Sequence, residues 1–107
     1  MSEINFSPDA LEDIKEIKAY ITDELCNEQS AINTVKKIMK RIRQLENFPK
    51  MGSPLSSIVN IHVPYRFLVC GNYITFYKIE NNEIYIIRIL YGRRNFMQIL
   101  FGKSFDE

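Results

Sequence analysis

The chain has 107 residues, of which 46% are hydrophobic and 12% aromatic, so its size and composition predict a single domain over residues 1–107 with one core. It contains no run of about 18 apolar residues, which argues against a membrane-spanning helix, and its first residues lack the layout of a signal peptide, so we expect a cytoplasmic protein. The formal net charge of +1 supports at most a local basic surface, not a uniformly basic nucleic-acid binder.

Residues 3–6 alternate polar and apolar side chains, which predicts a short edge strand. A helix then begins at Ser7-Pro8-Asp9, because serine accepts a hydrogen bond from a free first-turn amide and proline suits the first helical position. Its apolar stripe consists of Leu11, Ile14, Ile17, Ile21 and Leu25. We expect this helix to end near Cys26.

Asn27 is the expected cap of a second helix, which the short link makes the antiparallel partner of the first. Its apolar stripe consists of Ala31, Val35, Ile38, Ile42 and Leu45. Lys36, Lys40 and Arg43 fall together on another face. They have two interpretations: a solvated helix face, or a patch that binds phosphates or an acidic partner segment.

Proline and glycine in residues 48–54 end the second helix and predict a loop that continues to Asn60 without a clear period. His62 is the only histidine of the chain. A lone histidine in such a segment is more often a polar surface residue than a catalyst, although its titration range also suits proton transfer.

Three strands are predicted next, over residues 66–70, 73–79 and 84–91, from their aromatic and β-branched composition. Gly71-Asn72 and Asn81-Asn82 are typical of tight primed hairpin turns. The third run is apolar apart from Arg88, which predicts an interior strand. After Gly92 and the pair Arg93-Arg94, the residues around Phe96 predict a short helix or turn.

A period of two divides the side chains of these strands between two faces. Tyr73, Thr75, Tyr77 and Ile79 share one face of the second strand, opposite Ile74, Phe76 and Lys78. On the third strand, Ile84, Ile86, Arg88 and Leu90 lie opposite Tyr85, Ile87, Ile89 and Tyr91. The sequence leaves open which face the helices cover.

Together the elements predict an α+β fold: an N-terminal strand, an antiparallel helical hairpin packed on a mostly antiparallel sheet, and a short C-terminal helix or turn. Arg88 is either an ion-pair partner for an acid of the first helix or a target-binding residue. The two cysteines, Cys26 and Cys70, fit no metal or redox spacing, so we expect reduced thiols, no metal and no cofactor.

The order of these elements, with the strand GNYITFYKI followed by IYIIRILYGRRNF, resembles the RelE/ParE superfamily of toxins from bacterial type II toxin-antitoxin systems. The resemblance covers nearly the whole chain and is closer to ParE-like than to RelE-like members. It implies a toxin that inhibits growth and is neutralised by a cognate antitoxin, with a homodimer or a toxin-antitoxin hetero-oligomer as possible assemblies. ParE-like members act on DNA gyrase, whereas RelE-like members cut messenger RNA on the ribosome without a metal.

If the chain is RelE-like, the resemblance implies Arg93, Arg66 and Tyr91 as catalytic residues, with His62, Tyr73 and Tyr77 as weaker candidates. Two departures weaken this hypothesis. Tyr91 stands where other members often have histidine, and a phenol of ordinary pKa, about 10, is mostly protonated at neutral pH. Ile74 stands where RelE-like nucleases carry a catalytic arginine, and an isoleucine cannot stabilise phosphate charge.

We therefore favour ParE-like inhibition of gyrase, which needs no hydrolytic residue. Candidate residues for binding the target or nucleic acid are Arg88, Arg93, Arg94, Lys36, Lys40 and Arg43. The pair after Gly92 is the stronger candidate, because loops at strand ends commonly carry function. A non-enzymatic nucleic-acid-binding module, built on the basic second helix, is a further alternative.

Overall fold

A computed structural model describes residues 3–60, 62–92 and 96–101 of the chain. Five strands form one sheet in the order β1-β5-β4-β3-β2. The bounds of the strands are Glu3–Phe6 for β1, Ser53–Pro54 for β2, Tyr65–Cys70 for β3, Tyr73–Glu80 for β4 and Glu83–Tyr91 for β5. Among the strand pairs of these described residues, β1 and β5 are parallel and the others are antiparallel. The predicted edge position of β1 and interior position of β5 are both confirmed.

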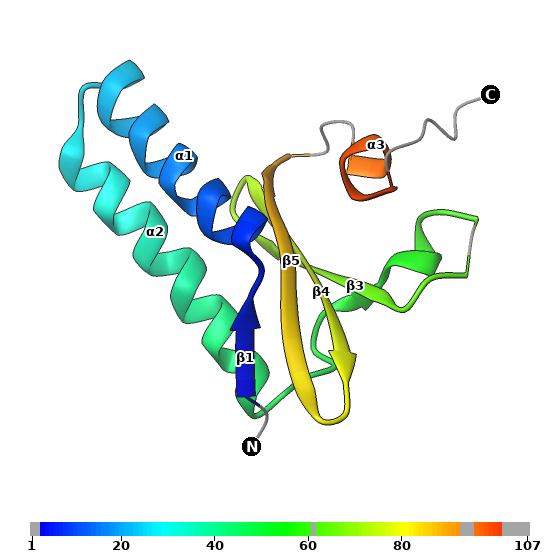
Figure 1. Cartoon of the computed structure of the whole chain (residues 1–107). Helices are drawn as coiled ribbons and strands as arrows, with labels where there is room; N and C mark the ends of the chain where they lie inside the picture. Colours follow the sequence, from blue (N-terminus) through cyan, green and yellow to red (C-terminus); the bar gives the residue numbers. More distant parts are fainter. Residues whose placement is uncertain (1–2, 61, 93–95, 102–107) are drawn as a thin grey trace.

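The helical hairpin consists of α1, Pro8–Glu24, and α2, Glu28–Arg43, which a short 3-10 turn η1, Gln44–Glu46, extends. The predicted N-caps are confirmed: the side chain of Ser7 accepts from the amide of Ala10, and that of Asn27 from the amide of Ser30. Both helices lie on one side of the sheet, whereas α3, Phe96–Phe101, lies on the other side (Figure 1). The α+β fold predicted from the sequence is thus confirmed.

The two hairpin turns adopt left-handed backbone conformations at the predicted positions. Gly71 has φ +60°, and Asn81 and Asn82 have φ +52° and +64°. Positive φ at the first central residue, or at both, is what two-residue primed turns require. These turns hold β3, β4 and β5 in the antiparallel register in which Tyr73 faces Tyr91.

The helices cover the sheet face that contains Tyr77, and this face forms the larger core. Its buried residues are Ala10, Ile17, Ile21, Ala31, Ile38, Ile42, Leu45, Leu68, Tyr77, Ile84, Ile86 and Ile89. A smaller cluster of Leu55, Phe76 and Leu90 forms on the opposite face. The ring of Phe96 from α3 stacks on Phe76 with a centroid distance of 5.4 Å, so α3 covers part of this second face.

A β-bulge interrupts β5. Tyr77 of β4 pairs with Ile86 of β5, but the preceding residue of β4, Phe76, pairs with Arg88, which leaves Ile87 as an extra residue in β5. Such a bulge resets the alternation of side chains along the strand that contains it.

The predicted division of β5 into two faces is therefore wrong beyond the bulge. The sequence grouped Arg88 and Leu90 with Ile84 and Ile86, on the assumption of an unbroken period of two. In the structure, Ile89 joins Ile84 and Ile86 in the helix-facing core, whereas Leu90 belongs to the opposite cluster. No turn residue marks the bulge in the sequence, so the alternation gave no sign of it.

The segment predicted as a plain loop contains structure of its own. Ser53 and Pro54 form β2, which pairs with Phe67 and Arg66 of β3, and a 3-10 turn η2, Leu55–Ser57, follows. Leu55 is fully buried under the second face of the sheet. Among the described residues, no helix is long and apolar enough to cross a bilayer.

Candidate functional site

The end of β5 carries an aromatic pair, of which Tyr91 is exposed and Tyr73 is half-buried. Tyr91 is 54% exposed, and its ring meets that of Tyr73 edge-to-face at a centroid distance of 5.4 Å. Gly92, with φ +59°, turns the chain away from the sheet, and its amide donates to the carbonyl of Asn72 at 2.6 Å. Arg93 and Arg94 follow directly in the sequence and lie outside the described residues.

The phenol of Tyr73 is poorly suited to act as a base. Burial raises the pKa of Tyr73 above its ordinary value near 10, and the neighbouring phenols of Tyr91 and Tyr20 raise it further. A group with a pKa this far above neutrality holds its proton at physiological pH. The pair Tyr73 and Tyr91 is therefore better equipped to offer ring surface and hydroxyl groups for recognition.

Tyr77 is fully buried and has a structural role. Its hydroxyl donates to the carbonyl of Pro49 at 2.8 Å and accepts from the amide of Gly52 at 3.1 Å. Both hydrogen-bonding functions of the hydroxyl are thus occupied by the loop between η1 and β2. A substrate outside the protein has no access to this phenol.

Arg66 holds the same loop. Its Nη2 donates to the carbonyls of Lys50, at 3.1 Å, and Gly52, at 2.7 Å. The guanidinium is therefore bound to backbone oxygens of the loop that precedes β2. Its buried Nε has no hydrogen-bond partner among the described residues. To stabilise a phosphate, the guanidinium of Arg66 would first have to break its hydrogen bonds to this loop.

Arg88 makes the ion pair that was one of its two interpretations. Its Nε and Nη2 donate to the two carboxylate oxygens of Asp13 at 2.7 and 2.8 Å. The hydrogen bond from Asp13 raises the pKa of Arg88, against the opposing effect of burial. Asp13, 5% exposed, also accepts from the amide of Ile89 at 2.9 Å, where β5 extends beyond its pairing with β1.

The remaining nuclease candidates are dispersed. His62 is exposed in the segment between η2 and β3, and within the described part of the chain it forms no hydrogen bond. Ile74 packs against the second core cluster, opposite the helices. Within residues 3–60, 62–92 and 96–101, no three His, Cys, Asp or Glu side chains are grouped as metal ligands would be.

Lys36, Lys40 and Arg43 of α2 are exposed and lie on the face where the sequence grouped them. No ion pair of these three side chains is found within the described part of the chain. Arg41 differs, because its guanidinium contacts the carbonyl of Val69 at 3.4 Å and the side chain of Gln44 at 3.1 Å. The exposed cations leave both interpretations of this face, solvated surface or binding patch, in place.

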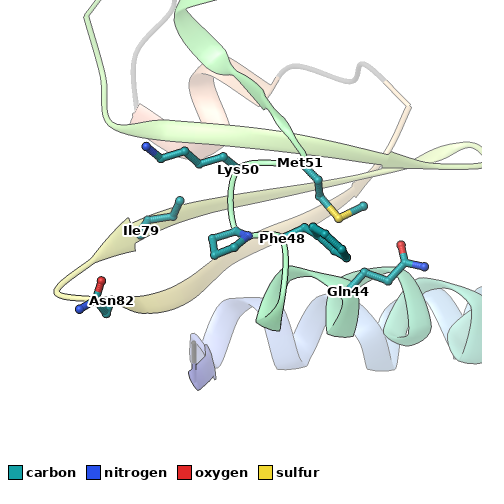
Figure 2. A pocket seen from close by; sticks show the side chains of 7 residues that line it. Gln44, Phe48, Lys50, Met51, Ile79 and Asn82 are labelled. Carbon is teal, nitrogen blue, oxygen red and sulfur yellow. The ribbon is translucent and has the colours of Figure 1, made fainter. Parts of the chain in front are cut away.

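Sequence reasoning missed a surface hollow beside the end of α2. It has a volume of about 690 Å³ and is lined by Gln44, Phe48, Pro49, Lys50, Met51, Ile79 and Asn82 (Figure 2). We call it the Phe48 hollow. Its lining comes from the loop and from the distant β4–β5 hairpin, so proximity in the sequence could not reveal it; the apolar residues within the loop were the one signal.

Comparison with known proteins gives the family. Residues 4–96 match the family described as the ParE toxin of the type II toxin-antitoxin system parDE. No curated protein sequence matches the chain significantly. Several solved structures share the fold, with sequence identities that carry no information beyond it.

One such structure is the chromosomal ParDE TA system from P. aeruginosa, with a TM-score of 0.73, 20% identity, and coverage of 87% of this chain and 98% of that chain. The YoeB-YefM complex from Staphylococcus aureus has a TM-score of 0.55 and 21% identity, with coverage of 85% of this chain and 97% of that chain. The RelB-RelE antitoxin-toxin complex from Methanococcus jannaschii has a TM-score of 0.52 and 18% identity, with coverage of 91% of this chain and 98% of that chain. The family match extends over most of the chain and agrees with the element order, so the chain belongs to the ParE toxin family of type II toxin-antitoxin systems, within the RelE/ParE superfamily.

Proposed function

We propose that this chain is a growth-inhibiting toxin that a cognate antitoxin neutralises, and that it acts by binding DNA gyrase. The observation that carries the proposal is the match of residues 4–96 to the ParE toxin family. The antitoxin partner is proposed from related structures, because those of similar fold include the complexes YoeB-YefM and RelB-RelE. Gyrase is the target that the resemblance to ParE-like toxins implies.

The arrangement of side chains favours binding over hydrolysis. Metal-free RNA cleavage needs a base, an acid and free cations around the phosphate. Among the candidates within the described residues, Tyr77 is buried, Arg66 is bound to the loop, and Arg88 is paired with Asp13. Tyr91 is exposed and beside a further aromatic ring, which suits recognition of a protein surface.

Ribosome-dependent cleavage of messenger RNA is the second candidate, because RelE and YoeB structures share the fold. It would have to rely on Tyr91, His62 and Arg93, with Ile74 in place of the arginine of RelE-like nucleases. A tyrosine base would demand a strongly lowered pKa, whereas the pKa of the neighbouring Tyr73 is raised.

The deciding experiment is a paired assay on purified protein. One arm measures supercoiling by gyrase, and the other measures cleavage of messenger RNA on translating ribosomes. We expect gyrase inhibition with intact RNA. Codon-positioned cleavage with unaffected gyrase would reject the gyrase target and make the chain a nuclease that works without an arginine at Ile74.

The nucleic-acid-binding alternative makes a separate demand. It requires salt-sensitive binding of the free protein to bare RNA or DNA, lost when Lys36, Lys40 and Arg43 are changed to Ala. We expect no such binding at physiological salt, because the net charge is only +1. Normal bacterial growth during soluble expression of the wild-type chain, with no antitoxin present, would contradict the toxin function altogether.

A further inference from the structure

The Phe48 hollow combines a large open volume with an apolar wall. Phe48 is 65% exposed and, with Pro49, Met51 and Ile79, provides most of the lining, while Lys50 is the lining cation. In Figure 2, Gln44, Phe48 and Met51 lie toward one end of the hollow, and Ile79 and Asn82 of the β4–β5 hairpin lie at the other. A volume of about 690 Å³ is large enough for more than one apolar side chain of a partner.

The loop that forms one wall is held in place by the sheet. The hydroxyl of Tyr77 bridges Pro49 and Gly52, and Arg66 binds the carbonyls of Lys50 and Gly52. A Cβ at Gly52 would lie 2.6 Å from the carbonyl oxygen of Phe67, so the loop is packed directly on β3. Because the backbone of this wall is already hydrogen-bonded to the sheet, less of it has to be ordered on binding, which lowers the entropy cost of association.

A basic strip continues from the hollow along α2. Arg41 Nη1 contacts the side chain of Gln44, which itself lines the hollow, and Lys37 lies one turn earlier on the same helix face. Arg41 also reaches Val69, which is 49% exposed on the part of β3 that β2 does not pair. The residues that line the hollow include no carboxylate.

The chemistry of this surface points to one occupant. Nucleic acid would contact the cations but leave the apolar hollow empty, whereas a neutral apolar peptide would fill the hollow without pairing with the cations of the strip. A protein segment that carries carboxylates beside a large apolar side chain would use both. Resting on the proposed function, we infer that the Phe48 hollow and the strip of Lys37 and Arg41 bind an acidic, apolar-anchored segment of the antitoxin.

A photo-crosslinking experiment in cells tests this assignment. A photoreactive phenylalanine analogue replaces Phe48, and the probe is the co-expressed protein that the gene adjacent to the toxin gene encodes. Leu25 is the matched control position, because it is 61% exposed and lies at the opposite end of α2. Restored growth shows, independently of the crosslink, that the probe binds and neutralises the toxin.

We expect restored growth with a toxin–antitoxin adduct from position 48. Restored growth with an adduct from position 25 alone would overturn the assignment while leaving the toxin function intact. An adduct between two toxin copies at position 48 would also overturn it, since a second copy would then fill the hollow. Failure of the probe to restore growth of a toxic wild type would reject both this inference and the proposed partnership.

A second readout isolates the charges. Lys37→Glu with Arg41→Glu should weaken binding of the purified antitoxin by about tenfold or more, with the larger loss at low salt. Lys15→Glu with Lys18→Glu on exposed positions of α1 is the control and should leave the affinity near that of the wild type. Equal losses for both pairs would mean general electrostatic attraction, which contradicts a defined strip.

Discussion

Asp13 shows how one buried carboxylate can join two distant parts of the chain. It accepts two hydrogen bonds from Arg88 and one from the amide of Ile89, all from β5, while its backbone belongs to α1. The amide of Ile89 lies past the residues that pair with β1, so without Asp13 it would be a donor lacking a partner. The carboxylate thus completes the sheet edge and neutralises the strand arginine.

Asp13→Ala should therefore lower the free energy of unfolding by about 3 kcal/mol, because it leaves a partly buried cation and a buried amide unpaired. Urea denaturation followed by circular dichroism measures the change. Glu12→Ala, at the exposed neighbouring position, is the control and should stay near the wild type. Equal stability of the two variants would show that the ion pair contributes little.

Tyr73 should make stability depend on alkaline pH. Its pKa is raised in the folded protein, mainly by burial, so above about pH 10 the unfolded chain loses this proton while the folded chain keeps it. The unfolded state then binds fewer protons, and the free energy of unfolding falls as pH rises from 10 through the folded pKa. The urea midpoint of unfolding should fall less between pH 8 and pH 11 for Tyr73→Phe than for the wild type. An equal fall in both proteins would contradict a raised pKa of Tyr73.

At the scale of elements, Ser7 joins β1, α1 and β5. Its amide donates to the carbonyl of Ile86 and its hydroxyl to that of Ile87, the extra residue of the bulge, while the same hydroxyl accepts from Ala10 as the cap of α1. One hydroxyl thus sets where the helix begins and how it meets the bulged strand. Asn27, by contrast, caps α2 at an exposed turn and holds only that helix.

Ser7→Ala should accordingly lower the free energy of unfolding by about 2 kcal/mol, and Asn27→Ala by about 1 kcal/mol. The loss at Ser7 is larger because the substitution also leaves the carbonyl of Ile87 in the bulge without its hydrogen-bond donor. Chemical denaturation of the two variants provides the comparison. Ser7→Thr keeps the hydroxyl and should recover part of the loss. A greater loss at Asn27 would mean that helix capping alone determines these effects.

At the scale of the whole molecule, the helices cover one face of the sheet, and α3 with η2 covers part of the other. The aromatic pair of Tyr73 and Tyr91 lies at the end of β5, whereas the Phe48 hollow lies beside the end of α2. Two surfaces, built from different elements, are thereby available for two different partners. Under the proposed function, one surface would bind the target and the other the antitoxin.

Arg93→Ala with Arg94→Ala should reduce toxicity at least about tenfold, measured as surviving colonies after induced expression, because interface arginines commonly dominate recognition. Circular dichroism and thermal unfolding should match the wild type, since these substitutions follow the last strand of the sheet. Lys15→Ala with Lys18→Ala controls for lost positive charge. Full toxicity of the arginine variant would remove this segment from the target-binding surface.

The sequence by itself determined the order and type of the main elements and both helix caps, because these depend on neighbours a few residues apart. It also determined the family, through the strands that end in YGRRNF. The β-strand at Ser53 and the bulge at Ile87 were not predictable in this way. Both depend on pairing with residues of another strand.

Only the tertiary structure decided the burial and the bonding partners of the candidate residues. Asp13 and Arg88 are 75 residues apart, and Tyr77 and Pro49 are 28 apart, so their bonds exist only once the sheet and helices have packed. Packing gave Tyr77, Arg66 and Arg88 hydrogen-bond partners within the fold, and it created the Phe48 hollow. A side chain's type limits the chemistry available to it, but its burial and its partners are set by residues far away in the sequence.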